Sequence, residues 1–239
     1  MKKLILPLLL FAIVIIHASC SKKPPFEYKQ LILQPGPDTK DEGQDCLVAF
    51  RETDNDLYAS SNHSGNPDVA AIRWTYNADN AGEGTNRTYI KFTRLSEIPS
   101  EAEIVAAKLS LYGVESGVAA PIGNSYYPGS PYETYTDNAC WLKRVTGDWS
   151  EATITWNNKP ATTEVDKASI PASTTEWNFD VPNIDVTKMV KQMVTSGENN
   201  GFCLELKNEQ IYRAIVFGSS EHPDPTKRPK LIVNYKVRK

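Results

Sequence analysis

The sequence predicts an all-β protein, an antiparallel two-sheet β-sandwich of jelly-roll type with one short amphipathic helix. Three observations lead to this prediction. About ten short segments alternate apolar and polar residues, the pattern of strands with one face on a core and one in water. Turn-forming residues separate these segments. A helical spacing of apolar residues occurs once, and runs of strong helix formers are scarce.

The clearest predicted strand covers residues 103–112. Val105, Ala107, Leu109 and Leu111 fall on one of its faces, because side chains alternate along a strand. The other predicted strands cover residues 46–50, 69–75, 89–93, 139–145, 153–156, 177–181, 202–206, 211–217 and 231–235.

The predicted helix lies between the last strands. Asp185 or Thr187 can cap its start, and Gly197 can end it. Its apolar residues follow the i, i+3, i+4, i+7, i+8 spacing of one helix face: Val186, Met189, Val190, Met193 and Val194. We expect this helix to cover an open edge or end of the sandwich.

The N-terminus predicts export. Lys2 and Lys3 precede a short apolar run, and small residues precede Cys20, which is typical of a bacterial lipoprotein signal peptide over residues 1–19. His17 departs from this pattern, so ordinary secretion is the alternative. We expect lipid on Cys20, a poorly ordered lipid-anchored tether over 20–44 and one domain over 45–239. The expected location is the outer membrane, facing away from the cytoplasm, with the membrane contacted through lipid alone.

Four stretches of the chain form a set found together in one family. They are residues 35–37 with 44–47 and 62–67; residues 87–92, 98–99 and 104–112; residues 149–151 with 153–160, which read WSE and TITWNNKP; and residues 185–187, 200–202, 217–221 and 228–231. In this order they resemble the DNRLRE-type domains of bacterial exported proteins, which are related to carbohydrate-binding modules for acidic polysaccharides. The resemblance implies a non-catalytic sugar-binding or adhesive β-sandwich.

The chain departs from that family in three places. The hexapeptide DNRLRE is absent, and residues 113–138 look like an insertion. Thr93 and Arg94 stand where the resemblance implies an aspartate followed by a leucine. Any role that depends on that carboxylate is therefore not expected here.

Catalysis and nucleic-acid binding are not expected. His63 and His222, the two histidines after the signal, belong to no catalytic motif, and the acidic residues show no spacing that selects a glycosidase pair. The formal net charge is −3, and no basic cluster suggests a nucleic-acid partner. The three later cysteines fit no zinc site; they are expected as buried thiols, with one disulfide among them left open.

Two loops are the predicted sugar-binding region. Long loops in compact domains are often functional, and tyrosines on them offer flat faces with little entropy to lose. The alternative is that the insertion covers a sheet edge. The predicted ligand-binding residues of these loops are Tyr126, Tyr127, Tyr132, Tyr135, Trp74 and Tyr76. Trp149 and Trp156 are instead expected to support the core or a turn, with Glu151 accepting backbone N–H bonds.

Two charged features complete the prediction. Lys91, Lys108 and Lys143, with Arg73 and Arg87, are expected to form a cationic stripe for a uronate chain, or alternatively to keep the sheet soluble. Asp54, Asn55 and Asp56 are the candidate ligands for a structural calcium ion; no other cofactor is expected. The predicted function is non-catalytic polysaccharide binding at the cell envelope. The alternatives are a structural or adhesion protein that contacts another envelope protein and, less favoured, a polysaccharide hydrolase or lyase.

Overall fold

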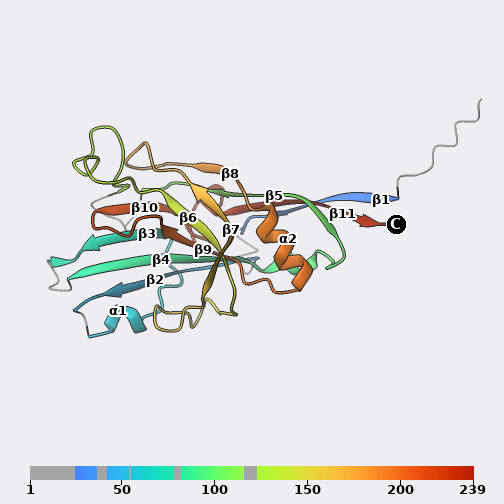
Figure 1. Ribbon diagram of the computed structural model, residues 1–239, viewed down its shortest axis with the longest axis horizontal. Helices are drawn as coiled ribbons and strands as arrows, with labels where there is room; N and C mark the ends of the chain where they lie inside the picture. Colours follow the sequence, from blue (N-terminus) through green and yellow to red (C-terminus); the bar gives the residue numbers. More distant parts are fainter. Residues whose placement is uncertain (1–24, 37–41, 54, 78–81, 116–122) are drawn as a thin grey trace, which may run out of the picture.

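The computed structural model describes residues 25–36, 42–53, 55–77, 82–115 and 123–239. Figure 1 shows the elongated arrangement of their strands and helices. The elements are β1 (Phe26–Leu33), β2 (Gly43–Arg51), α1 (Leu57–Ser60), β3 (Asp68–Thr75), β4 (Glu83–Phe92), β5 (Glu103–Leu111), β6 (Cys140–Val145), β7 (Thr162–Ile170), β8 (Val181–Asp185), α2 (Thr187–Ser196), β9 (Phe202–Leu206), β10 (Arg213–Gly218) and β11 (Lys230–Arg238).

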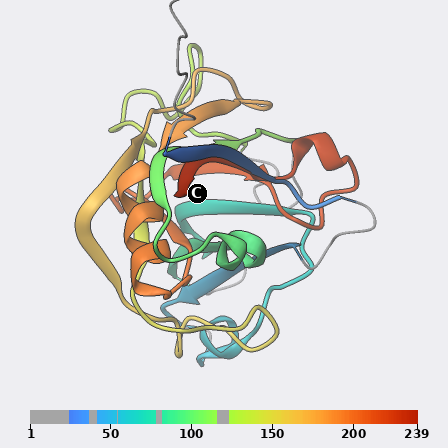
Figure 2. The same cartoon turned by 90° about the vertical axis from the view of Figure 1, so that its right-hand side faces the viewer.

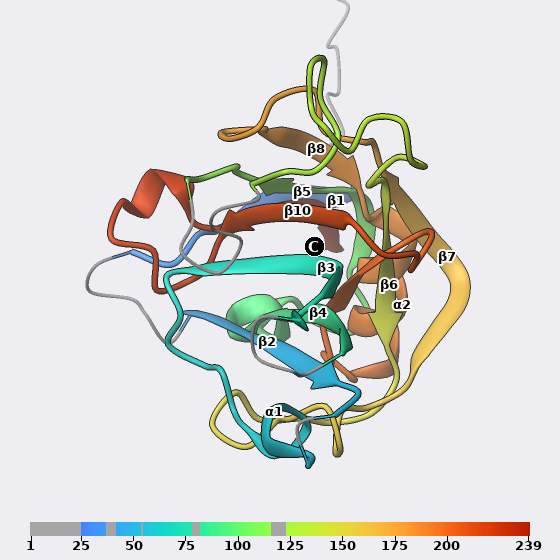
Figure 3. The ribbon, with the colours of Figure 1, turned by 90° about the vertical axis from the view of Figure 1, so that its left-hand side faces the viewer.

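The strands form two antiparallel sheets, so the predicted sandwich class is confirmed. The smaller sheet has the order β1-β11-β5-β8. The larger sheet has the order β10-β3-β4-β9-β6-β7, with β2 paired to β4. Seen along the long axis, the larger sheet bends from β10 and β3 through β4 to β6 and β7 (Figure 3).

The main core lies where the two sheets and α2 meet. Leu109 of β5 and Leu204 of β9 are among the fully buried residues of this cluster. Met189, Val190 and Met193 bring the apolar face of α2 into it, against β5 and β7 (Figure 2). The predicted helix and its role in closing one side of the sandwich are therefore confirmed.

The C-terminal end of α2 follows the prediction, but its start does not: Val186 is the N-cap and makes no side-chain cap bond, and Asp185 lies one residue earlier. The side chain of Asp185 accepts hydrogen bonds from the Thr187 N–H and hydroxyl at 3.0 and 2.7 Å. Hydrogen bonds from Lys108 and Thr187 hold the pKa of Asp185 below its ordinary value. At the other end, Gly197 has φ 74° and its N–H reaches Val194 O, which ends the helix.

The predicted tether is too long. Residues 26–33 form β1, which pairs with β11 from Phe26 opposite Arg238 to Leu33 opposite Leu231. Leu33 is fully buried in the main core. The prolines on both sides of this segment concealed a strand whose Leu31 and Leu33 face inward.

Three other strand boundaries differ from the prediction. Residues 153–156 are a turn and not a strand, because the Ile154 N–H bonds back to Ser150 O and only Ile154 is buried. The strand expected at 177–181 lies later, as β8. β7 was missed because it is an edge strand with mostly exposed residues and therefore lacks apolar alternation.

No helix among the described residues has the length and hydropathy of a membrane span. The predicted signal peptide 1–19 and the lipidation residue Cys20 lie outside the described residues and stay predictions.

Candidate functional site: a tryptophan–lysine face

The described part of the insertion, residues 123–138, covers the free edge of β10. The Ser125 N–H bonds to Ala214 O at 3.0 Å, and the Ala214 N–H bonds to the Ser125 hydroxyl at 3.0 Å. Asn124 accepts from the Val216 N–H at 3.0 Å, and Asn138 donates to Ala214 O at 2.7 Å. The loop therefore serves the alternative role, that of protecting an edge strand from pairing with other chains.

Three of the predicted loop residues, Trp74, Tyr132 and Tyr135, join an aromatic cluster with Tyr212. Trp74 meets Tyr132 edge-on at a centroid distance of 4.8 Å and Tyr212 at 5.2 Å. Tyr132 also stacks on Tyr212 at 5.7 Å, and Tyr135 lies 5.3 Å from Tyr212. Tyr135 is the outermost ring, with 48 % of its surface exposed. Tyr212 was missed because the sequence prediction placed it inside a strand over 211–217, whereas in the structure it lies just before β10 with φ 65°.

The other predicted loop residues lie apart from this cluster. Tyr76 and Tyr58 sandwich the Arg51 guanidinium at 3.8 and 3.6 Å from their ring centroids. Tyr126 and Tyr127 are half-buried, and Tyr126 O accepts a hydrogen bond from the Ser173 hydroxyl at 2.6 Å. The expected single tyrosine platform is therefore not formed.

A second set of side chains gathers on one face of β4, β9 and β6. In the ladders, Tyr89 and Lys143 both lie opposite Cys203, and Trp141 lies opposite Glu205, so these side chains share a face. Arg87 lies two residues before Tyr89 and points the same way.

The connection between β6 and β7 covers part of this face. Its Trp149 and Ile154 are buried against Tyr89 and Cys203, among others. The Trp149 indole N–H donates to Asn200 O at 2.9 Å, and Glu151 accepts the Asp45 N–H at 2.8 Å. Trp149 is thus a core support, as predicted.

The part of this sheet face that the β6–β7 connection leaves uncovered carries two half-buried tryptophans, Trp141 and Trp156, each with at least one lysine ammonium group over its ring. The Trp141 ring has the Lys167 and Lys207 ammonium groups 3.9 and 4.5 Å from its centroid. The Trp156 ring has Lys159 at 3.7 Å, and it stacks on Phe50 at 5.7 Å. We call this set the tryptophan–lysine face: Arg87, Trp141, Lys143, Trp156, Lys159, Lys167 and Lys207.

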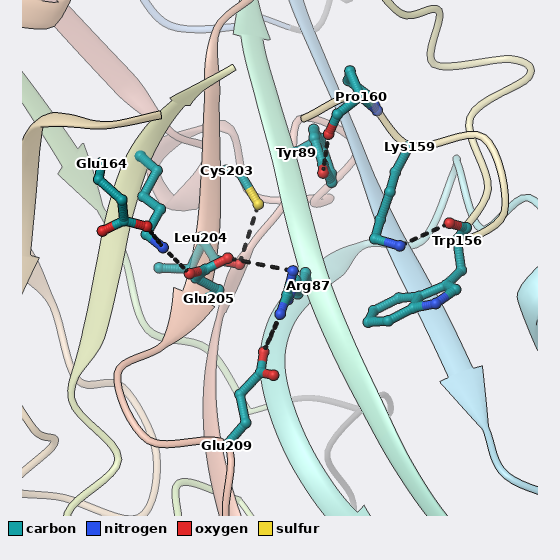
Figure 4. A network of polar contacts seen from close by, with 11 residues as sticks. Arg87, Tyr89, Trp156, Lys159, Pro160, Glu164, Cys203, Leu204, Glu205 and Glu209 are labelled. Atoms are coloured by element: carbon teal, nitrogen blue, oxygen red, sulfur yellow. Dashed lines mark hydrogen bonds and ion pairs between the residues drawn. The ribbon is translucent and has the colours of Figure 1, made fainter. Parts of the chain in front are cut away.

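Carboxylates hold the cations of this face in place. Lys143 pairs with both Glu164 and Glu205, while Arg87 lies 3.5 Å from Glu205 and 2.8 Å from Glu209 (Figure 4). Burial disfavours the charged form of Lys143, but its bonds to the two glutamates outweigh burial and raise its pKa. The same lysine, with Lys167, lowers the pKa of Glu164 to about 2. Five basic residues against three acidic ones leave the face cationic on a chain of net charge −3.

The predicted stripe of Arg73, Arg87, Lys91, Lys108 and Lys143 does not form as one set. Lys108 lies on β5 of the smaller sheet and pairs with Asp185, and Arg73 pairs with Glu83. Arg87 and Lys143 belong to the tryptophan–lysine face, whereas Lys91 lies against Trp149. Arg87 faces Trp156, whose ring centroid is 5.4 Å away. Lys91 instead donates to Trp149 O at 2.8 Å and lines a cleft with Gln44 and Asn199. Burial lowers the pKa of Lys91 against the opposing effect of Asp148 and Glu151.

The carboxylates that could hold a cation lie away from the predicted calcium ligands. Asn55 and Asp56 form an exposed left-handed turn before α1, and Asp54 lies outside the described residues. Asp45, Glu151 and Glu221 instead bring one oxygen each within 4.8 Å of one another. Asp45 is 2 % exposed, and burial together with Glu221 raises its pKa.

The cysteines among the described residues are free. Cys46, Cys140 and Cys203 are all buried, and burial raises the pKa of Cys46 and of Cys203 to about 12. They therefore act as small apolar core residues, and the disulfide left open by the sequence is not formed.

This geometry, a rigid β-sandwich with tryptophans on a sheet face, fits a protein that binds sugars, and sequence comparison identifies the family. The model of carbohydrate-binding module family 96 matches residues 53–235, well over half of the chain. The chain belongs to carbohydrate-binding module family 96. The predicted kinship with carbohydrate-binding modules is thereby confirmed. In this family 96 module, β1 lies before the matched residues.

The module is also similar to short parts of much longer proteins. It is 27 % identical over 157 residues to "tRNA nuclease WapA" of Bacillus subtilis and to "tRNA3(Ser)-specific nuclease WapA" of Bacillus spizizenii. The match covers 65 % of this chain but 6 % of each relative. The chain thus corresponds to a small fraction of those nucleases.

Proposed function

We propose that this family 96 module captures acidic polysaccharides on the tryptophan–lysine face and performs no chemistry on them. The observation that carries the proposal is the pairing of Trp141 with Lys167 and Lys207 on one sheet face. Aromatic faces pack on the C–H side of sugar rings, and ammonium groups beside them can meet a uronate carboxylate. The resemblance to DNRLRE-type domains supports the same ligand class.

The lysines are suited to exchange partners. A cation–π contact at an exposed site contributes about 0.5–1 kcal/mol, which a carboxylate on the same sugar can replace. When a uronate ring covers Trp141, Lys167 and Lys207 can turn from the ring to the carboxylate, which replaces the 2.8 Å ion pair of Lys167 with Glu164 and the 2.6 Å hydrogen bond from Lys207 to the Ser169 hydroxyl. Arg87 and Lys143, fixed by Glu205, would supply a positive field that does not move.

We also propose that the protein is lipid-anchored through Cys20 at the outer membrane. β1 begins at Phe26, so few residues separate the proposed anchor from the sandwich. Single sugar contacts are weak, and many copies in one membrane would retain a polymer by multivalency. Replacement of Cys20 by alanine should release the protein from the membrane fraction; retention of that variant would contradict the anchor.

The binding test is affinity electrophoresis in gels that contain polygalacturonate, alginate or a neutral glucan. We expect retardation by the uronate polymers and a loss of it in the double variant Lys167→Met with Lys207→Met. The matched control, Lys230→Met with Lys236→Met, removes the same charge from β11, where Lys236 lies over Phe26. Equal retardation of the two double variants would refute the proposed face.

A release assay separates binding from catalysis. We expect no new reducing ends from either uronate polymer and no cleavage of tRNA, because the match to the nucleases covers 6 % of their length. Product formation would favour the hydrolase, lyase or nuclease alternative. Capture of an envelope protein without any glycan retardation would favour the adhesion alternative.

A further inference from the structure

A polar cleft lies beyond Trp149, apart from the tryptophan–lysine face. It forms where the start of β2, the end of β4, the exit of β6 and the residues after α2 come together. Its volume is about 590 Å³, within the range of small-molecule sites. Gln44 lies directly opposite Lys91 in the β2–β4 ladder, so the two side chains enter the cleft from the same face.

Two amide oxygens that line this cleft are not paired. Among the described residues, neither Gln44 Oε1 nor Asn199 Oδ1 has a hydrogen-bond donor, although both atoms are buried. The Asn199 amide donates to Phe92 O at 2.8 Å, which identifies its oxygen as the free atom. Buried acceptors without donors are costly, so a ligand whose O–H or N–H donors meet these oxygens when the amide side chains turn toward the cleft would be favoured here.

The charges of the cleft select against an acidic ligand. Lys91 shares the lining of the cleft with two carboxylates, those of Asp148 and Glu198. The Lys91 ammonium is already engaged with Trp149 O at 2.8 Å and with the Trp149 ring, whose centroid is 4.7 Å away. A uronate would meet more negative than positive charge, whereas neutral hydroxyl groups can pair with both the amides and the carboxylates.

One wall of the cleft is tied to the core. Asn200 is buried and its carbonyl accepts the Trp149 indole N–H at 2.9 Å. Gly201 follows at φ 71°, and a Cβ there would lie 2.2 Å from Ile90 O, so no larger residue fits at this position. These contacts join the wall to the Trp149 support and to β4.

We infer that this cleft binds a neutral, hydroxyl-rich sugar residue, separately from the acidic chain on the tryptophan–lysine face. The inference depends on the proposed function, since it assumes that the module binds carbohydrate. A polymer or mixture that contains both uronate and neutral sugars could then engage both sites.

The test is a ¹⁵N NMR titration with the methyl glycosides of glucose, galactose, mannose and xylose, and with sodium glucuronate. We expect at least one neutral glycoside to shift the amide signals of Lys91, Asn199 and Asn200, and glucuronate to bind less tightly. Gln44→Met should weaken that binding about fivefold, the effect of one neutral hydrogen bond. No shift with any neutral glycoside, tighter binding of glucuronate, or unchanged binding in Gln44→Met would overturn the inference.

A second variant keeps the two sites distinguishable. Trp141→Ala should weaken uronate-polymer binding about tenfold or more and leave the neutral-sugar shifts intact. If both are lost in a folded variant, the cleft is not a separate site. If uronate polymers never bind but the neutral-sugar shifts persist, the tryptophan–lysine face fails and the cleft stands.

Discussion

The aromatic cluster and the tryptophan–lysine face use similar residues for different ends. In the aromatic cluster, Trp74, Tyr132 and Tyr212 pack on one another. On the tryptophan–lysine face, Trp141 is flanked by two lysine ammonium groups. Aromatic rings that contact each other stabilise a fold, while rings that contact flexible cations can exchange them for a ligand. The number of aromatic residues in a loop is therefore a poor guide to a binding site.

The largest expected effect tests the structural side of this comparison. Trp74→Ala should lower the free energy of unfolding by about 3 kcal/mol, because it removes a large ring and two edge-on aromatic contacts. Urea denaturation measures the loss. Tyr135→Ala, the exposed control, should change it by less than about 0.5 kcal/mol. The comparison reverses if Trp74→Ala stays stable and loses polysaccharide binding.

The next effect tests the binding side. Trp141→Ala should weaken uronate-polymer binding about tenfold or more, or about 1.4 kcal/mol, since it removes a sugar-stacking surface. Isothermal titration calorimetry measures the loss, with the melting temperature nearly unchanged. Tyr28→Ala is the control, because Tyr28 is an exposed aromatic residue on β1 of the smaller sheet. Equal losses in both variants would show that the face has no special part in binding.

A smaller effect concerns the mobile cations. Lys167→Met with Lys207→Met should weaken uronate binding about fivefold at low salt, and the difference from the native protein should shrink as salt is added. Retardation measured across a sodium chloride series checks this. A loss that is independent of salt would mean that the lysines act through packing and not through charge.

The smallest expected effect concerns Asp45, outside both regions. Because its pKa is raised in the folded state, the stability linked to its neutral form is present below about pH 4 and is lost as the pH rises toward the folded pKa. In the presence of EDTA, Asp45→Asn should therefore raise the melting temperature by a few degrees at pH 7 and leave it unchanged at pH 3. The Asn amide can still accept from the Ser220 N–H and can donate to a glutamate. A lower melting temperature at pH 7 would contradict this account.

Local patterns were enough to predict the sandwich class, most strands and α2. Alternation in 103–112 identified β5, and the spacing from Val186 to Val194 identified the helix. β1 and β7 escaped because edge strands bury few residues and so leave little apolar signal. Residues 153–156 misled because a turn with one buried isoleucine can imitate a short strand.

The candidate site was predicted only in part. Of the five residues of the predicted cationic stripe, Arg87 and Lys143 lie on the face, because strand parity turns them the same way, while Lys91 and Lys108 lie elsewhere. Trp141 lies two residues before Lys143 on the same predicted strand, so their side chains share a face. The alternation of this strand therefore also indicates Trp141 as a residue of the site. Lys159, Lys167 and Lys207 could not be assigned, because their strands and loops meet Trp141 and Trp156 only after the chain has folded.

The sequence by itself determined the all-β class, the amphipathic helix with its C-terminal glycine cap and the kinship with carbohydrate-binding modules. These properties depend on residue periodicity and motif order, which are local along the chain. Tertiary structure decided which aromatic rings pack together, which are flanked by lysines and where unpaired amide oxygens meet in a cleft. Those features depend on strand register and loop closure between residues far apart in sequence, and no local pattern encodes such distances.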